Sequence, residues 1–241
     1  MSLRASPQPL VQSVCTSKLG EELEACEDVL RIGGGDELRI ALSDGASTAS
    51  FSAEWANRLA GWFVARSQHP DREALIRMAP ALGKGWRQLV TSRPLPWHAE
   101  EKMQDGSFAT LLGVSVIDSR WRAIAVGDTC LFQIRDGSLC TSFPYTTAEQ
   151  FGARPILVWT GPSTPTFAGA IREAEGELQP ADVIVAATDG FAQWLVANVE
   201  RDRQPWDVFK QGPTAIQELV NEERAARRMR NDDVACAWFT L

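Results

Sequence analysis

The sequence predicts an α+β layered domain built from antiparallel strands and a few long helices. Short apolar runs separated by turn residues fill its centre and predict strands at Thr110–Ile117, Trp121–Val126, Cys130–Arg135 and Leu139–Ser142. Asp136-Gly137 lies between the last two runs, and this dipeptide is a strong signal for a tight hairpin. Helical patterns interrupt these hairpin-linked strands, which favours layered sheets and helices over a doubly wound parallel sheet.

Length and composition favour a single globular domain. The 241 residues are 44% hydrophobic and 23% charged, values typical of a folded protein. We expect a loose N-terminal arm over residues 1–12 and one domain over residues 13–241. The net charge of −7 argues against binding to nucleic acid. No stretch approaches the ~20 apolar residues that cross a bilayer, and the N-terminus lacks the apolar core of a signal peptide. We therefore expect no nucleic-acid or membrane partner.

The cysteines and histidines argue against zinc. The five cysteines are odd in number and form no Cys-x-x-Cys pair, so a disulfide framework is not expected and a reducing cytoplasm is favoured. We expect Cys15, Cys26, Cys130, Cys140 and Cys236 to be buried small hydrophobic side chains. The two histidines, His69 and His98, match no metal-ligand pattern, and we expect them in loops.

The first half of the chain predicts one strand and two helices. The run Leu38–Leu42 alternates and then stops at a turn, as a strand does. The next apolar residues recur at helical spacing, with Ser52 as the expected N-cap. A second helical region covers parts of Asp71–Val90, with a break expected near Pro80 and Gly83.

The second half predicts two strands and two helices. Val183–Ala187 is an almost wholly apolar strand, and Val234–Phe239 is the final one. Helical patterns cover Phe191–Val199 and Pro213–Arg228.

Two of the four Asp-Gly pairs stand where chemistry is expected. Asp44-Gly45 and Asp189-Gly190 each follow an apolar strand and precede a helix, which places a carboxylate at a rigid sheet edge. Asp136-Gly137 is explained as a hairpin, and Asp105-Gly106 as a loop before a strand. Taken alone, each of the first two pairs is also compatible with a simple turn.

Two acidic doublets occupy similar positions. Glu27-Asp28 precedes the apolar segment Val29–Ile32, and Asp232-Asp233 opens the last strand. Adjacent carboxylates repel, so burial of such pairs requires a compensating cation. One interpretation is solvated loop acids; the other is a site where Asp28, Asp44, Asp189 and Asp232 converge on divalent metal. Oxygen ligands of this kind suit Mg²⁺ or Mn²⁺.

The order of these motifs resembles that of the protein phosphatase type 2C family, from about residue 20 to residue 239. The segments that carry the resemblance follow one another in the family's order: Gly20 to Asp28, Ala41 to Gly45, Gly106 to Thr110, Ala125 to Thr129, Ala187 to Gly190, and Asn231 to Ala235. Each motif is weak alone, whereas six in the right order are specific.

The resemblance implies a four-layer αββα sandwich, in which helices flank two central antiparallel sheets and two Mn²⁺ or Mg²⁺ ions bind at one end. It implies hydrolysis of phosphoserine or phosphothreonine in a protein substrate, such as a kinase or its target, by a metal-activated water. Asp44 would bridge both ions, with the carbonyl of Gly45 completing one shell. Asp189 and Asp232 would hold the second ion, and Glu27 and Asp28 would orient bound waters. The implied catalytic residues are Asp44, Asp189 and Asp232.

The sequence departs from the family's pattern at two informative positions. The usual phosphate-binding arginine is replaced by Leu23, and an aspartate that helps hold a third ion is replaced by Gln193. The resemblance therefore implies at most a weak third ion at Asp128. The alternative to an active enzyme is a catalytically weak pseudophosphatase that binds a phosphoprotein or kinase partner.

Four arginines precede Asp232 and allow two interpretations. They form either a solvated basic end of a helix, favoured by its dipole, or a docking patch for acidic partners: Arg224, Arg227, Arg228 and Arg230.

Overall fold

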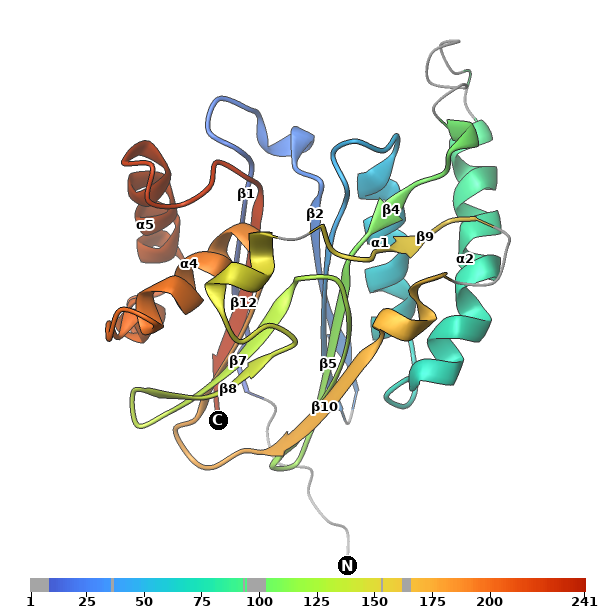
Figure 1. Cartoon of the computed structure of the whole chain (residues 1–241). Helices are drawn as coiled ribbons and strands as arrows, with labels where there is room; N and C mark the ends of the chain where they lie inside the picture. The colour runs from blue at the N-terminus through green and yellow to red at the C-terminus, as the bar shows by residue number, and fades with distance from the viewer. Residues whose placement is uncertain (1–8, 36, 93, 95–102, 153, 162–165) are drawn as a thin grey trace, which may run out of the picture.

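The computed structural model describes residues 9–35, 37–92, 94, 103–152, 154–161 and 166–241. Two antiparallel sheets pack face to face, and helices cover both outer surfaces (Figure 1). On one side lie α1 (Ser52–Val64) and α2 (Arg72–Thr91), and on the other α4 (Asp189–Val199) and α5 (Pro213–Ala225). The predicted four-layer α+β sandwich is confirmed.

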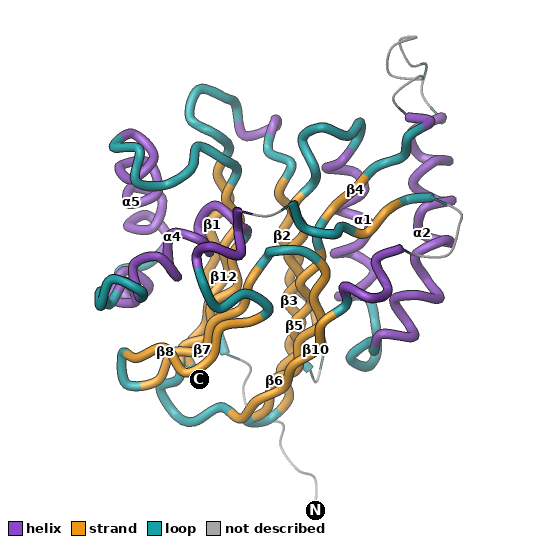
Figure 2. Tube along the Cα trace, in the orientation of Figure 1, coloured by secondary structure: helices purple, strands orange, loops and turns teal. Residues whose placement is uncertain are grey.

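Each central sheet has five strands, which run between the two helical layers (Figure 2). The first sheet contains, in spatial order, β1 (Gln12–Thr16), β12 (Val234–Thr240), β11 (Val183–Ala187), β7 (Cys130–Arg135) and β8 (Ser138–Phe143). The second contains β10 (Arg172–Glu177), β6 (Arg120–Val126), β5 (Leu111–Ile117), β3 (Leu38–Asp44) and β2 (Asp28–Gly34). A small sheet pairs β4 (Phe108–Ala109) with β9 (Val158–Trp159).

Short 3-10 helices complete the chain: η1 (Leu23–Ala25), η2 (Ala148–Gly152), η3 (Thr166–Ala170) and η4 (Pro205–Lys210). Residues 1–8 of the expected N-terminal arm lie outside the described residues, and β1 begins at the arm's last position. His98 also lies outside them.

Strands with two buried faces explain the apolar runs of the sequence. In β3, Ile40 and Leu42 pack between the sheets, whereas Ala41 faces α1 and α2. In β11, Ile184 packs between the sheets and Val185 faces the other helical layer. Each strand is therefore apolar on both sides, as expected for the interior of a four-layer sandwich.

Helix α2 runs without the break expected near Pro80 and Gly83, so that prediction is wrong. Asp71 caps the helix by accepting a hydrogen bond from the Ala74 amide at 2.8 Å. At Gly83 a Cβ atom would lie 2.2 Å from the carbonyl oxygen of Thr160, so glycine is required for close packing rather than for a break. None of the described helices, including this 20-residue one, is long and apolar enough to span a membrane.

The cysteine prediction is only partly correct. Cys130 and Cys236 are buried as expected, whereas Cys15 and Cys140 are exposed and Cys26 is half-buried. Strand β10 was not predicted, because it is an edge strand whose charged residues alternate without an apolar run.

Candidate active site

Strand ends bring five aspartates to one end of the sandwich. Asp28 and Asp44 lie directly opposite each other in the β2–β3 register. Asp128 occupies the connection through which the chain passes from β6 in the second sheet to β7 in the first. Asp189 begins α4 just after β11, and Asp232 lies two residues before β12. The charges of the other four aspartates all act on Asp44, so the structure brings the predicted residues together.

A cleft of about 250 Å³ opens between the ends of the two sheets. Three carboxylates line it, those of Asp44, Asp128 and Asp189, together with the side chains of Arg154 and Arg230. Its remaining wall combines apolar and small residues: Ala46, Thr110, Phe151, Gly152, Pro155 and Leu157. The cleft is therefore small and charged, with acids and bases on one surface.

Burial perturbs the carboxyl groups strongly. It raises the pKa of Asp28 and of Asp44 well above the usual range, and neighbouring aspartates add to the effect on Asp44. Burial also raises the pKa of Asp128 to about 7. The pKa of Asp189 is raised by burial and by the charge of Asp232. Ionisation of these carboxyl groups is therefore disfavoured unless a cation binds beside them.

The donor set fits a hard divalent cation. Asp28 is buried, and its Oδ2 atom has no hydrogen-bond partner among the described residues. A buried, unpartnered carboxylate oxygen is costly unless a cation or water meets it. Oxygen donors of this kind suit Mg²⁺ and Mn²⁺. In the described part of the chain, however, no three His, Cys, Asp or Glu side chains lie close enough to hold an ion as they stand.

Glu27 and Asp233 hold the segment that enters β2. The carboxylate of Glu27 accepts a hydrogen bond from the hydroxyl of Ser52. The buried carboxylate of Asp233 accepts hydrogen bonds from the backbone amides of Glu27, at 2.8 Å, and Lys18, at 3.0 Å. Within the acidic doublet, Asp233 is thus a bracing residue, a distinction that the sequence did not reveal.

Gly45 is required by the close approach of α1. A Cβ atom at Gly45 would lie 2.8 Å from the backbone carbon of Ser52. Ser52 itself is the first residue of α1 and not its N-cap, which is Phe51. The N-cap prediction is wrong because the Ser52 hydroxyl bonds to Glu27 instead of to the helix.

Two cations lie among the carboxylates. The Nζ atom of Lys18 is 3.4 Å from Oδ1 of Asp232 and 4.0 Å from the carboxylate of Glu27. The Nη1 atom of Arg230 donates to Oδ2 of Asp189 at 2.9 Å. Although burial alone would lower the pKa of Lys18, the nearby aspartates raise it. Both side chains come from segments that adjoin the site. The acidic motifs by which the sequence locates the site contain neither of them.

The other arginines of the basic segment have separate tasks. Arg224 is buried and donates to the carbonyl of Ser17 at 3.0 Å and to that of Asp232, so it joins the two segments that flank Lys18. Arg228 pairs with Glu223 at 2.6 Å on the surface. Neither a solvated helix end nor a docking patch describes all four arginines.

The two departures from the family's pattern lie on surfaces near the site. Leu23 is 57% exposed in η1, four residues before Glu27. Gln193 is half-buried in the first turns of α4, after Asp189. Arg31 is exposed and donates a hydrogen bond to the side-chain oxygen of Asn57 at 2.9 Å.

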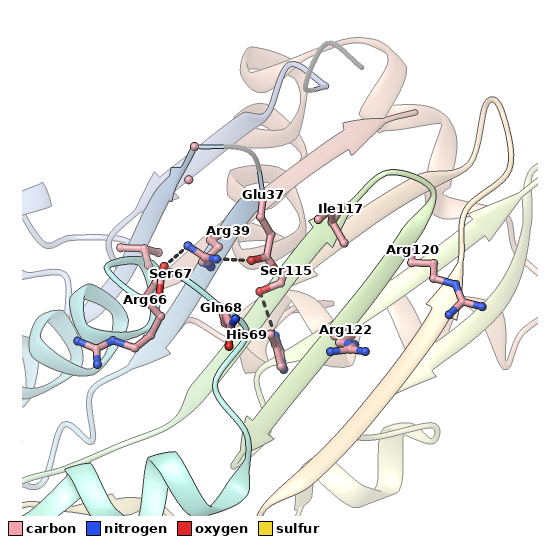
Figure 3. A pocket seen from close by; sticks show the side chains of 13 residues that line it. Glu37, Arg39, Arg66, Ser67, Gln68, His69, Ser115, Ile117, Arg120 and Arg122 are labelled. Carbon is pink, nitrogen blue, oxygen red and sulfur yellow. Dashed lines mark hydrogen bonds and ion pairs between the residues drawn. The ribbon is translucent and has the colours of Figure 1, made fainter. Parts of the chain in front are cut away.

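A larger hollow of about 870 Å³ lies at the opposite end of the second sheet (Figure 3). The seven residues of β2, from Asp28 to Gly34, separate it from the acidic end by roughly 20 Å. Here Arg39 is buried and is held by Glu37 and by the backbone carbonyl of Arg66.

His69 lies in this hollow, in the loop position expected for it. Its Nδ1 atom is 2.9 Å from the hydroxyl of Ser115 (Figure 3). Burial lowers its pKa to about 4, so the ring is neutral at physiological pH. The histidine therefore contributes to packing at a place remote from the aspartates.

Comparisons with known proteins were made on sequence and on structure. A family model described as Protein phosphatase 2C matches residues 21–231. No curated protein matches the chain in sequence. The fold is similar to that of the serine/threonine phosphatase Stp1 from Staphylococcus aureus, with a TM-score of 0.68 and 12% identity, over 100% of this chain and 98% of that chain.

Two further solved structures show the same fold. PppA, a regulatory component of T6SS in Pseudomonas aeruginosa, has a TM-score of 0.60 and 15% identity, over 96% of this chain and 98% of that chain. The catalytic domain of the serine/threonine phosphatase PstP, solved with two manganese ions, has a TM-score of 0.58 and 16% identity, over 96% and 97% of the two chains.

Proposed function

The chain belongs to the protein phosphatase 2C family, and from this premise we propose that it hydrolyses phosphoserine and phosphothreonine in partner proteins with Mn²⁺ or Mg²⁺ as cofactor. Residues 13–241 would form its single catalytic domain. The substrate would be a phosphorylated protein such as a kinase or a kinase's target.

The observation that carries the proposal is a group of aspartates whose negative charges are only partly offset by nearby cations. Asp28 and Asp44 face each other across neighbouring strands, and both have strongly raised pKa values because they are buried. A fold that retained these carboxylates only for stability would be expected to pair them internally. Divalent cations offset such a cluster, because they favour its ionised form.

The roles follow from the positions of the carboxylates. Asp44 would contact both ions, and the carbonyl of Gly45 would complete one shell. Asp189 and Asp232 would hold the second ion, while Glu27 and Asp28 would complete the shells through water. When bound, the ions supply the positive charge and the water acidity that phosphoryl transfer requires. Because Gln193 is a neutral ligand, a third ion at Asp128 would bind weakly.

Phosphate capture would depend on the cations already present in the cleft. The exposed Leu23 side chain cannot bind an oxyanion. Arg230 lines the cleft and lies against Asp189, and Arg154 lines the same cleft. A guanidinium group binds a phosphate through paired, charge-assisted hydrogen bonds, so these two residues are suited to replace the missing arginine.

One observation favours the alternative of a catalytically weak pseudophosphatase. Lys18 and Arg230 form ion pairs with Asp232 and Asp189, two of the carboxylates proposed to hold the second ion. Metal binding there would have to compete with these internal cations.

The deciding experiment is turnover of a phosphothreonine peptide and of an aryl phosphate across a series of Mn²⁺ and Mg²⁺ concentrations. We expect hydrolysis to appear with metal and to disappear in excess chelator. Hydrolysis that persists undiminished in chelator would refute the metal requirement. Tight binding of the phosphopeptide without turnover at any metal concentration would identify a pseudophosphatase.

A further inference from the structure

Two cysteine side chains meet beside the candidate site. The Sγ atoms of Cys15 and Cys26 are 3.7 Å apart, although the residues are 11 positions apart in the chain. Cys15 is exposed and Cys26 is half-buried, so small solutes reach the pair from solution. Cys140 is also exposed. Its sulfur contacts the backbone carbonyl of Ser138 at 3.9 Å, whereas the sulfurs of Cys15 and Cys26 contact each other.

The fold itself produces this meeting. Strands β1 and β2 are edge strands of different sheets, and they contact each other along the same side of the sandwich. Val14 packs under α4 and α5, so strand alternation points the neighbouring Cys15 toward the other sheet. Both sulfurs lie near the backbone carbonyl oxygen of Asp28, Cys15 at 3.9 Å and Cys26 at 3.7 Å. The pair is thus centred on the first residue of β2.

We propose that Cys15 and Cys26 form a redox modification site, which hydroperoxides convert into a disulfide. A disulfide requires a sulfur–sulfur distance of about 2.05 Å, so the two sulfurs must approach by about 1.7 Å. Rotation of the exposed Cys15 side chain and a small shift of the segment before β2 supply this approach.

The chemistry is balanced with the hydroperoxide as the oxidant. One thiol attacks the peroxide bond and becomes a sulfenic acid, while the remainder of the hydroperoxide leaves as water or an alcohol. The second thiol then attacks the sulfenic sulfur, forms the disulfide and releases water. The protein loses two hydrogen atoms, and a thiol reductant reverses the change.

The bond would connect the edge of the first sheet to the segment that carries Glu27 and Asp28. Cys26 directly precedes Glu27, so a shift of its sulfur pulls on residues that face the candidate metal site. Displacements of about 1 Å at a catalytic site are sufficient to cost a large part of the rate. This consequence rests on the proposed function, and we expect the oxidised protein to be at least about tenfold slower.

Peptide mapping of the full chain tests the modification directly. The protein is treated with hydrogen peroxide in chelator, its remaining thiols are alkylated, and it is digested with trypsin without reductant. Lys18 lies between the two cysteines, so trypsin separates them unless a disulfide joins their peptides. We expect the joined peptide in the unmodified chain and in Cys140→Ser, its loss in Cys15→Ser, and its disappearance with reductant. Separate peptides in which each cysteine is oxidised alone would overturn the proposal.

A second measurement separates this inference from the proposed function. Phosphopeptide turnover with Mn²⁺ is compared before and after peroxide, for the unmodified chain and for Cys15→Ser. Loss of rate in the first and retention in the second supports the link between the disulfide and the site. Equal rates in reduced and fully joined protein would overturn that link. If the joined peptide forms in a protein that never hydrolyses phosphopeptide, the modification site stands and the proposed function fails.

Discussion

The two ends of the second sheet treat buried charge in opposite ways. At the hollow shown in Figure 3, the buried guanidinium of Arg39 is met by Glu37, and the exposed Arg120 and Arg122 pair with acids of β10. At the other end, the buried Asp28 and the half-buried Asp44 lie opposite each other, and no ion pair of the described residues includes either one.

This difference separates a structural charge from a functional one. A buried charge that has its partner within the fold contributes to a defined structure and needs nothing from solution. Buried carboxylates that repel one another destabilise the fold until a cation binds to them. The comparison therefore points to the acidic end as the place of chemistry, although the hollow at the opposite end is the larger of the two.

The largest expected effect is the loss of activity when the acidic end is altered. Asp44→Asn removes a carboxylate proposed to contact both ions, so we expect the metal-dependent rate to fall by at least about a hundredfold. The variant should remain folded, because the change removes a repelling charge without making a cavity. Glu177→Gln, at an acid that is 74% exposed at the arginine end, is the matched control and should leave the rate unchanged. An unchanged rate in Asp44→Asn would contradict the proposed site.

Substitutions at the hollow around Arg39, the arginine end of the sheet, should change stability and not activity. Glu37→Gln leaves the buried Arg39 without its acidic partner, so we expect the free energy of unfolding to fall by about 2 kcal/mol. Denaturant unfolding measures the loss, and the rate at saturating metal should stay the same. Glu175→Gln removes an exposed partner of Arg122 and should change stability by less than about 0.5 kcal/mol. A large loss of activity in Glu37→Gln would show that the two ends are coupled.

A smaller effect is expected when a cation is added beside the acidic end. Leu23→Arg introduces a group able to bind phosphate by paired hydrogen bonds, so KM for a phosphopeptide should fall about tenfold with little change in kcat. Leu19→Arg places the same charge on a neighbouring exposed position and should have a weaker effect. Equal KM values for Leu23→Arg and the unmodified chain would indicate that Arg230 or Arg154 already holds the phosphate.

The last expected effect is a pH dependence of stability in the metal-free protein. Burial raises the pKa of Asp28 and Asp44, and that of Asp128 to about 7, so the folded protein holds protons that the unfolded chain has already released. Stability should therefore fall as pH rises from about 5 to about 8, which thermal unfolding in chelator measures. Saturating Mn²⁺ should flatten the dependence, since it favours the ionised carboxylates. A melting temperature that rises with pH in chelator would contradict this account.

The sequence predicted the strands better than the contacts between distant segments. Runs such as Val183–Ala187 were identified because both faces of each strand are buried, and the aspartates were found because each lies at or close to the end of a strand. The ion pair of Lys18 with Asp232 joins segments from the two ends of the chain, and no local pattern encodes it. The continuity of α2 through Pro80 was missed for the same reason, because packing of Gly83 against Thr160 overrides the local preference.

The pairing of β1 with β12 bears on the order of folding. Gln12 lies opposite Trp238, so the first sheet joins strands from the two ends of the chain. Contacts between residues so far apart form slowly, because a long loop must close before they contribute. During synthesis on a ribosome, the second sheet's β2, β3, β5 and β6 are able to pair early, and β11 is able to pair with β7, whereas β1 must wait for β12. Nascent chains that end before β12 should therefore carry Asp28 and Asp44 in a partly folded protein, exposed to proteases and without a completed cleft.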